Sequence, residues 1–197
     1  MKCRGLLSDL GNSIHKYIKD FQLSLQITDY IDSPIEIDRR GLALAMVEAY
    51  QKQGKYAEAI REATALWESN PSDAVVCLSL CELVVTSPSS SKAELEDIVQ
   101  MTNTVENDDP IYTNILYLRG AAMYRMQLAD AALEQLSLLL RKKTDRPDSL
   151  LHQIRYLRGR LYEQQNQKVR AKKDYELIFA EDSAFRDVRS RIGSPMP

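Results

Sequence analysis

The sequence of 197 residues has little glycine and proline, the two residues that most often interrupt helices. Only seven of each occur, and both disfavour helix interiors. Leu, Ala, Glu, Gln, Lys and Arg dominate instead, and these side chains lose little freedom in a helix. The composition therefore predicts an all-α fold, and the length allows one sizeable core or a short stack of repeats.

Long apolar runs and a cysteine framework are also absent. No apolar stretch approaches the roughly 20 residues needed to cross a bilayer, and the N-terminus has Lys2 and Arg4 but no signal-peptide pattern. We therefore expect no membrane insertion, although the chain can be a fragment of a longer, membrane-attached protein. Three cysteines, Cys3, Cys77 and Cys81, show no disulfide spacing, which favours a reduced, cytoplasmic location.

The chain lacks a strong net charge, since 26 Lys and Arg oppose 28 Asp and Glu. A nucleic-acid-binding domain usually has a clear basic excess, so nucleic acid is disfavoured as a partner. The charges are uneven, however: residues 1–140 hold 12 basic and 20 acidic side chains, and residues 141–197 hold 14 and 8. Two interpretations stay open: solvated outer helix faces, or a basic surface for an acidic partner. That surface would comprise Lys168, Arg170, Lys172 and Lys173, and its partner would be an acidic surface or a nucleic acid.

The sequence contains no catalytic or metal-binding constellation. Ser13 and Ser89 each begin a Ser-x-x-Lys pattern, but the further motifs of that enzyme class do not follow. His15 and His152 have no spaced acid or cysteine partner, and there is no glycine-rich phosphate loop. We therefore expect no enzyme activity, no cofactor and no metal.

Apolar residues near the N-terminus recur at intervals of three and four, the period of one helix face. They are Leu6, Leu7, Leu10, Ile14, Tyr17, Ile18, Phe21, Leu25, Thr28 and Ile31. The pattern predicts an amphipathic helix within residues 1–35, or two shorter helices because of Gly11. It should end at Ser33, because a residue before proline avoids the helical region.

An internal repeat organises the rest of the chain. Tyr-Leu-Arg-Gly occurs at residues 117–120 and again at residues 156–159. In each copy an alanine follows the glycine by twelve residues and a large apolar or aromatic residue follows it by sixteen. These followers are Ala132 and Leu136 in the first copy, and Ala171 and Tyr175 in the second. Such self-similarity indicates a repeat architecture.

Residues 36–71 have the pattern of a helical hairpin. Gly54 separates two amphipathic stretches, and Asn70 before Pro71 ends the second. Ala59 and Ala63 are small enough to let the two helices approach closely.

These residues resemble a tetratricopeptide repeat. The family has a small residue and an aromatic in its first helix, a turn of glycine and an aromatic, an alanine in its second helix and a closing proline. The matching residues are Val47, Tyr50, Gly54, Tyr56, Ala59 and Pro71. Val47 departs from the pattern, because the family has a smaller residue there.

The resemblance implies a right-handed α-α superhelix, a TPR-like solenoid of about four helical hairpins. Counting 34 residues onward from Val47 and Ala59 reaches Cys81 and Ala93. The repeats are predicted at residues 36–71, 72–106, 111–144 and 149–181, followed by a capping helix at 182–193 and a disordered tail at 194–197. The wording of the C-terminal segment is similar to the ends of bacterial TPR arrays, which suggests a bacterial source.

In this family the first helices of successive repeats line the concave face, which binds a peptide or a partner helix. The resemblance therefore implies a protein–protein interaction scaffold or adaptor. The candidate partner-binding residues are Tyr117, Tyr124, Arg125, Tyr156, Arg160, Glu163 and Gln164. The tyrosines can instead pack between adjacent repeats, and both interpretations stay open. One subclass clamps a peptide's C-terminal carboxylate, but Leu44 and Glu48 at matching positions disfavour that activity.

Two alternatives remain. The chain can be a structural module that forms a homo-oligomer through a solenoid edge or an exchanged N-terminal helix. The N-terminal helix can also lie in the groove, because Leu44, Val75 and Leu78 make the first half of the inner face apolar.

Overall fold

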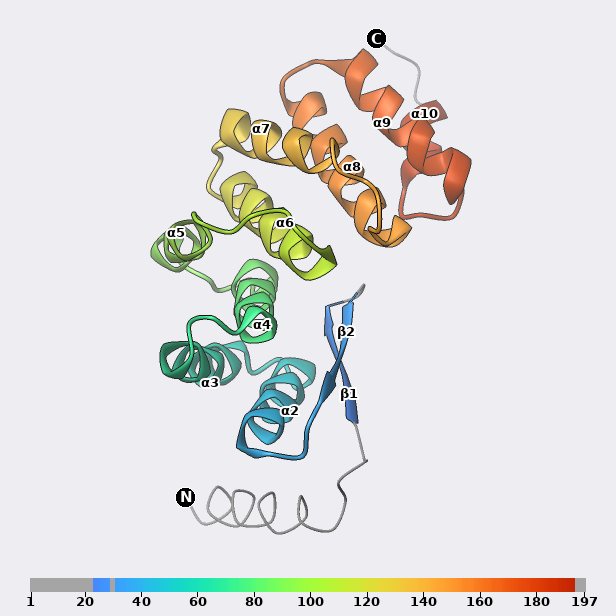
Figure 1. The fold of residues 1–197 in the computed structure, drawn as a ribbon. Coiled ribbons are helices and arrows are strands. Elements are labelled where there is room, and N and C mark those ends of the chain that lie inside the picture. The colour runs from blue at the N-terminus through green and yellow to red at the C-terminus, as the bar shows by residue number, and fades with distance from the viewer. Residues whose placement is uncertain (1–22, 29–30, 194–197) are drawn as a thin grey trace. The chain divides into compact units, whose positions relative to one another are not determined.

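The structure, a computed structural model, describes residues 23–28 and 31–193 (Figure 1). The chain divides into two compact units, one up to Ser90 and one from Ser91 onward. Each unit is described by itself. The boundary falls inside residues 72–106, the predicted second repeat. Residues 1–22 of the helix or helices predicted over 1–35 lie outside the described residues, as does the predicted tail at 194–197.

The first unit begins with an antiparallel hairpin of β1 (Leu23–Thr28) and β2 (Ile31–Ile35), in which Leu25 pairs with Ser33. Burial alternates along β2, where Asp32 is exposed between two buried neighbours. The prediction of a helix is therefore wrong for residues 23–28 and 31–35. The apolar residues there also fit a period of two, which is the period of a strand.

Three helices complete the first unit. They are α2 (Arg39–Lys52), α3 (Tyr56–Ser69) and α4 (Ala74–Thr86). Asp38 caps α2 by accepting from the Gly41 amide, and Asp73 caps α4 in the same way. Gly54 follows the end of α2 with φ 71°, a conformation that favours glycine. Ala59 and Ala63 are fully buried, which lets α3 pack closely on α2 and α4.

The second unit consists of helices in its described part. They are α5 (Lys92–Met101), α6 (Pro110–Arg125), α7 (Ala129–Leu139), α8 (Asp148–Gln164), α9 (Lys168–Glu181) and α10 (Val188–Gly193). Each packs on the next, and α10 packs on α9 and completes the core around Tyr175. Ala132 and Ala171 are buried in α7 and α9.

The residue of α5 that matches Ala59 was predicted wrongly. Ala93 was expected to match the buried Ala59, but Ala93 is exposed. Leu95 and Ile98 are the buried residues of α5, at 4% and 2% exposure. Leu95 is the fourth residue of its helix, as Ala59 is of α3. The longer turn before α5 therefore shifts the repeat by two residues.

The two longer connections of the second unit contact each other. Lys142 Nζ donates to the Asn107 carbonyl at 2.7 Å, and Arg146 Nη2 donates to the same oxygen at 3.2 Å. Arg146 is buried and its Nε also donates to Thr113 at the start of α6. The connection after α7 is thus fixed against the one that begins α6, which sets where α8 starts.

The capping helix is shorter than predicted. It begins at Val188, because Asp182 forms a turn in which its carboxylate accepts from the Ala184 amide at 2.9 Å. Phe185 lies in that turn and packs on the same core as Val188.

Candidate functional site

The chain's own strands cover part of the helix surface of the first unit. Ile35, Leu44 and Val76 form a buried cluster, with Leu25 and Val75 packed against it. Strand β1 lies against both α4 and α2. The sequence left open that an N-terminal helix lies against this apolar face, but residues 23–28 and 31–35 are strands. Leu44 and Val76, at 2% and 1% exposure, are closed to a partner while the hairpin stays docked.

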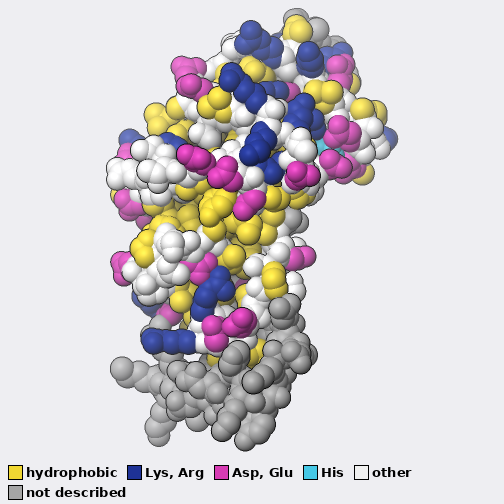
Figure 2. All heavy atoms as spheres, in the orientation of Figure 1, with side chains coloured by type: hydrophobic (Ala, Val, Ile, Leu, Met, Phe, Trp, Pro, Cys, Tyr) yellow, Lys and Arg dark blue, Asp and Glu magenta, His cyan; other side chains and the backbone are white. Residues whose placement is uncertain are grey.

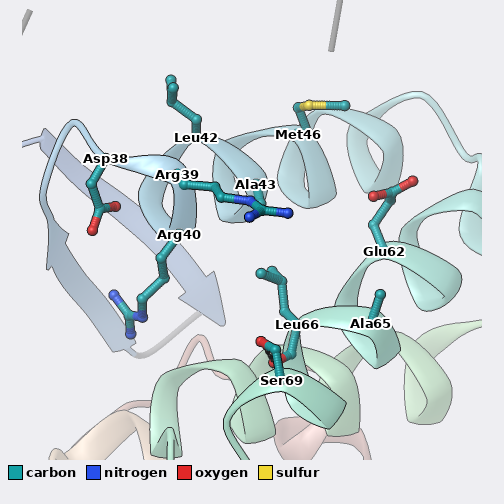
Figure 3. Close-up of a pocket in the computed structure, with 10 residues that line it drawn as sticks. All are labelled: Asp38, Arg39, Arg40, Leu42, Ala43, Met46, Glu62, Ala65, Leu66 and Ser69. Carbon is teal, nitrogen blue, oxygen red and sulfur yellow. Dashed lines mark hydrogen bonds between the residues drawn. The ribbon is translucent and has the colours of Figure 1, made fainter. Parts of the chain in front are cut away.

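A groove of about 740 Å³ lies between α2 and α3 (Figure 3). Ala43, Met46 and Leu66 give it apolar walls, and Arg39 and Glu62 add a charge of each sign. Sequence reasoning did not single out this groove. Its only advance sign was that Ala43 and Met46 are spaced for one helix face.

Arg40, beside this groove, is held by Asp73. Its Nη2 lies 2.8 Å from Asp73 Oδ1, and its Nε donates to the other carboxylate oxygen. Burial alone would raise the pKa of Asp73, but hydrogen bonds from Arg40 and the Val76 amide outweigh burial and lower it. Arg40 is therefore engaged in joining α2 to α4.

Helix α6 carries three of the predicted site residues, all half-buried: Tyr117, Tyr124 and Arg125. Tyr124 Oη accepts a hydrogen bond from Gln164 Nε2 of α8 at 3.2 Å. Tyr117 and Arg125 are each engaged in a further interaction in the folded chain. The structure therefore brings Tyr124 and Gln164 together across the two helices.

Helix α8 carries Arg160, Glu163 and Gln164 on the side toward Tyr124. The Arg160 side chain is 40% exposed, and its Nε lies 3.8 Å from Glu163 Oε2. That carboxylate already accepts from Arg191 Nη1 at 2.6 Å. Glu163 is thus occupied mainly by α10, while Arg160 stays accessible. The side of α6 and α8 that presents Tyr124, Arg160 and Gln164 is called the inner face below.

Tyr156 packs inside the second unit. It is 8% exposed, and its hydroxyl donates to Asp187 Oδ1 at 2.7 Å. Its ring lies against those of Tyr175 and Phe185, with the Arg186 guanidinium 4.8 Å from its centroid. Tyr156 therefore packs against α9 and the segment after it, whereas the packing alternative had placed it between adjacent repeats.

Sequence reasoning missed the part that α10 has in the site. Arg191 bridges Glu163 and Asp187, because its Nε also donates to Asp187 at 3.0 Å. The spacing of Asp187 and Arg191, four residues apart in a segment predicted to be helical, was the available sign. Covering the core was the only function assigned to this segment.

The basic residues of α9 lie on its outer side. Lys168, Arg170 and Lys173 are exposed. Lys172 Nζ lies 3.8 Å from Glu176 Oε1. In Figure 2, Lys and Arg side chains gather over the C-terminal helices in the upper part of the view. Both interpretations of the charge asymmetry are compatible with this placement.

Within residues 23–28 and 31–193, no group of three or more His, Cys, Asp or Glu is placed to hold a metal ion. Over the same ranges, no helix combines the length and apolar character needed to span a bilayer. Cys77 and Cys81 are buried free thiols.

Solved structures with the same arrangement of helices decide the fold. A thermophilic TPR protein of Thermus thermophilus, TTC0263, matches with a TM-score of 0.60 and 16% identity over 96% of each chain. The chain has the tetratricopeptide-repeat fold. Two MamA crystal structures match this TPR fold with TM-scores of 0.57 and 0.56 at 17% identity, covering 78% and 75% of this chain and 79% and 80% of theirs. The sequence matches no protein-family model and no curated protein.

The predicted fold class, an all-α TPR-like solenoid, is therefore confirmed, with the addition of the β1–β2 hairpin.

Proposed function

We propose that this protein is an interaction scaffold or adaptor that binds a peptide or partner helix on the inner face of its second unit. The observation that carries the proposal is that Tyr124, Arg160 and Gln164 stay accessible on α6 and α8. The hairpin, by contrast, closes the apolar face of α2 and α4. Aromatic and arginine side chains are the residues that most often dominate binding energy.

The predicted site residues have two different tasks in this proposal. Tyr124, Arg160 and Gln164 contact the partner, and Tyr117 and Arg125 flank them on α6. Two further residues, Tyr156 and Glu163, support the surface through their bonds to Asp187 and Arg191. A cytoplasmic location and a bacterial source belong to the same proposal, and rest on the cysteine usage and the C-terminal wording.

Site-specific photocrosslinking in the native host tests the proposal. A photoreactive amino acid at Tyr124 should crosslink a partner, whereas the same group at Leu138 should not. Leu138 is the matched control, because it is 44% exposed on α7. The double change Tyr124→Ala with Arg160→Ala should abolish partner capture and leave the helical circular dichroism intact. Crosslinks from Leu138 alone would place the binding surface elsewhere.

Self-association is a second candidate function, and the groove between α2 and α3 favours it. Its apolar wall includes Met46, which is half-buried and accessible to a second copy. Light scattering at two concentrations should then give a mass that rises with concentration and falls to the monomer mass in Met46→Glu. A monomer mass at both concentrations rules this function out.

A further inference from the structure

The inner face carries three hydrogen-bond donors, of which two, on Tyr124 and Gln164, are in contact. They are the Tyr124 hydroxyl, the Gln164 amide and the Arg160 guanidinium. Because Tyr124 Oη accepts from Gln164 Nε2 at 3.2 Å, the Tyr124 O–H hydrogen is directed to another acceptor. Arg160 and Gln164 are four residues apart on α8 and so lie on one side of it. The combined chemistry is that of a site for an oxyanion.

Arg160 shares its nearby carboxylate, Glu163, with Arg191, and the Tyr156 hydroxyl also interacts with the Arg160 guanidinium. Its Nε lies 3.8 Å from Glu163 Oε2, beyond hydrogen-bond distance, and Arg191 holds that oxygen at 2.6 Å. One carboxylate thus serves two guanidinium groups, and the second carboxylate nearby, Asp187, is bound by Tyr156 and Arg191. The Arg160 side chain is 40% exposed, so its guanidinium can donate hydrogen bonds to an external partner.

This cation is specific to α8 among the first helices of the hairpins. The glycine before it, Gly159, matches Gly120, Cys81 and Val47 of the other repeats, so the residues matching Arg160 are Ala121, Glu82 and Glu48. Ala121 is buried, and Glu48 pairs with Lys52. The repeat pattern therefore does not require an arginine at this position.

We infer that Arg160, with Gln164 and Tyr124, binds the side-chain carboxylate of an acidic segment in the partner. Arginine can hold both oxygens of a carboxylate in parallel hydrogen bonds, and the amide and hydroxyl can donate to the remaining lone pairs. A lysine-rich segment would instead meet Arg160 and Arg191 with like charge. The inference rests on the proposed function, since it names the chemistry that the same face recognises.

Fluorescence anisotropy of labelled peptides tests the inference with the full chain. The probe is a glutamate-rich hexapeptide whose ends are acetylated and amidated, so that only side chains carry charge. Two further probes replace each glutamate by glutamine or carry a single phosphoserine. We expect the glutamate probe to bind and the glutamine probe to bind about tenfold more weakly or not at all.

Variants of single residues should show whether the glutamate probe binds at the inner face or elsewhere on the surface. Arg160→Gln should weaken binding of the glutamate probe about tenfold, and Arg160→Lys should fall between, because lysine cannot hold both oxygens. Arg61→Gln on α3 is the matched control, because Arg61 is exposed and lies outside both basic surfaces, and it should bind like the unchanged protein. Circular dichroism of each variant checks that the helices are retained.

Other results would overturn the inference. Equal binding in Arg160→Gln removes the site. Loss of binding in Lys168→Gln with Lys173→Gln, but not in Arg160→Gln, places the acidic segment on α9. Tighter binding of the phosphoserine probe that depends on Arg160 overturns the carboxylate assignment in favour of a phosphate. If Tyr124 still crosslinks a partner while no acidic probe binds, the proposed function stands and this inference fails.

Discussion

Gly159 of α8 lies against the ring of Tyr175, sixteen residues later in α9. A Cβ at Gly159 would stand 2.7 Å from Tyr175 Cε1, closer than any ordinary contact. Gly120 and Leu136 repeat the relationship in the preceding hairpin, at 3.0 Å from Leu136 Cδ2. An added Cβ should be tolerated better at Gly120 than at Gly159. Leu136 Cδ2 is the end of a flexible side chain, whereas the Tyr175 ring is rigid and 1% exposed.

Gly159→Ala should therefore lower the free energy of unfolding. Forcing a methyl group into this contact costs about 1–3 kcal/mol, and the better helix propensity of alanine offsets about 1 kcal/mol. Gly120→Ala should lower the free energy of unfolding by a smaller amount. Urea unfolding of both variants measures the difference, and Tyr175→Leu in the Gly159→Ala background should recover part of the loss. Equal losses in the two alanine variants would contradict this explanation.

Gln127→Gly should raise the free energy of unfolding by about 1 kcal/mol. Gln127 follows the end of α6 with φ 63°, and Gly54 occupies the same position after α2 with φ 71°. Only glycine adopts this backbone without a steric cost. Gln127→Ala controls for loss of the side chain and should be close to neutral in thermal unfolding. A glycine variant no more stable than the alanine variant would remove the backbone explanation.

Ile35→Ala should loosen the hairpin from the helices of the first unit. Ile35 is 2% exposed in the cluster against which the single tryptophan, Trp67, packs. Truncating a buried isoleucine to alanine costs about 2–5 kcal/mol, so Trp67 fluorescence should shift to longer wavelength. Asp32→Ala in the same strand is the control, since Asp32 is exposed. An unchanged Trp67 spectrum in Ile35→Ala would show that the hairpin contributes little to this cluster.

Acid should release α10. Hydrogen bonds from Arg191 and then from Tyr156 lower the pKa of Asp187 to about 2 from 3.8. Because the folded pKa lies below the unfolded one, the stabilisation is complete above pH 3.8 and is lost as the pH falls through about 2. Amide chemical shifts of Val188 and Arg191, followed by NMR from about pH 5 to about pH 2, should show this step.

Asp187→Asn should remove that step and weaken the docking of α10 at neutral pH. A pH profile unchanged in Asp187→Asn would assign the titration to another carboxyl, such as Glu181. The pKa of Glu181 is also lowered, first by its hydrogen bond with His152.

Much of the fold could be predicted because repeats place the same constraint at the same spacing. Ala132 and Ala171 are buried where the two copies align, and Gly54 ends α2 as expected. The strands could not be predicted with certainty, because Leu25 and Ile31 fit periods of both two and three to four. Tertiary contact with α2 and α4 selects the strand. Ala93 was misplaced because a fixed spacing takes no account of loop length.

The candidate site was predicted less well than the fold. Phase assigns Tyr156 and Tyr124 to the same side of successive helices, yet Tyr156 is covered by the turn and helix after α9. Which tyrosine the last helix covers depends on tertiary packing, which spacing does not encode. The sequence named Arg160 as a candidate contact residue, but the competition between Arg160 and Arg191 for Glu163 became visible only with all three positions in place.

Helix α5 begins at the first residues of the second unit with two reciprocal bonds. The Ser91 amide donates to Glu94 Oε2 at 2.7 Å, and the Glu94 amide donates to Ser91 Oγ at 3.2 Å. Both bonds close within four residues, so this turn needs no distant segment to form. Starting a helix is the slow, entropically costly step, and extension follows quickly. Ser91 and Glu94 therefore lower the cost of starting α5 with side chains that belong to its own first turn.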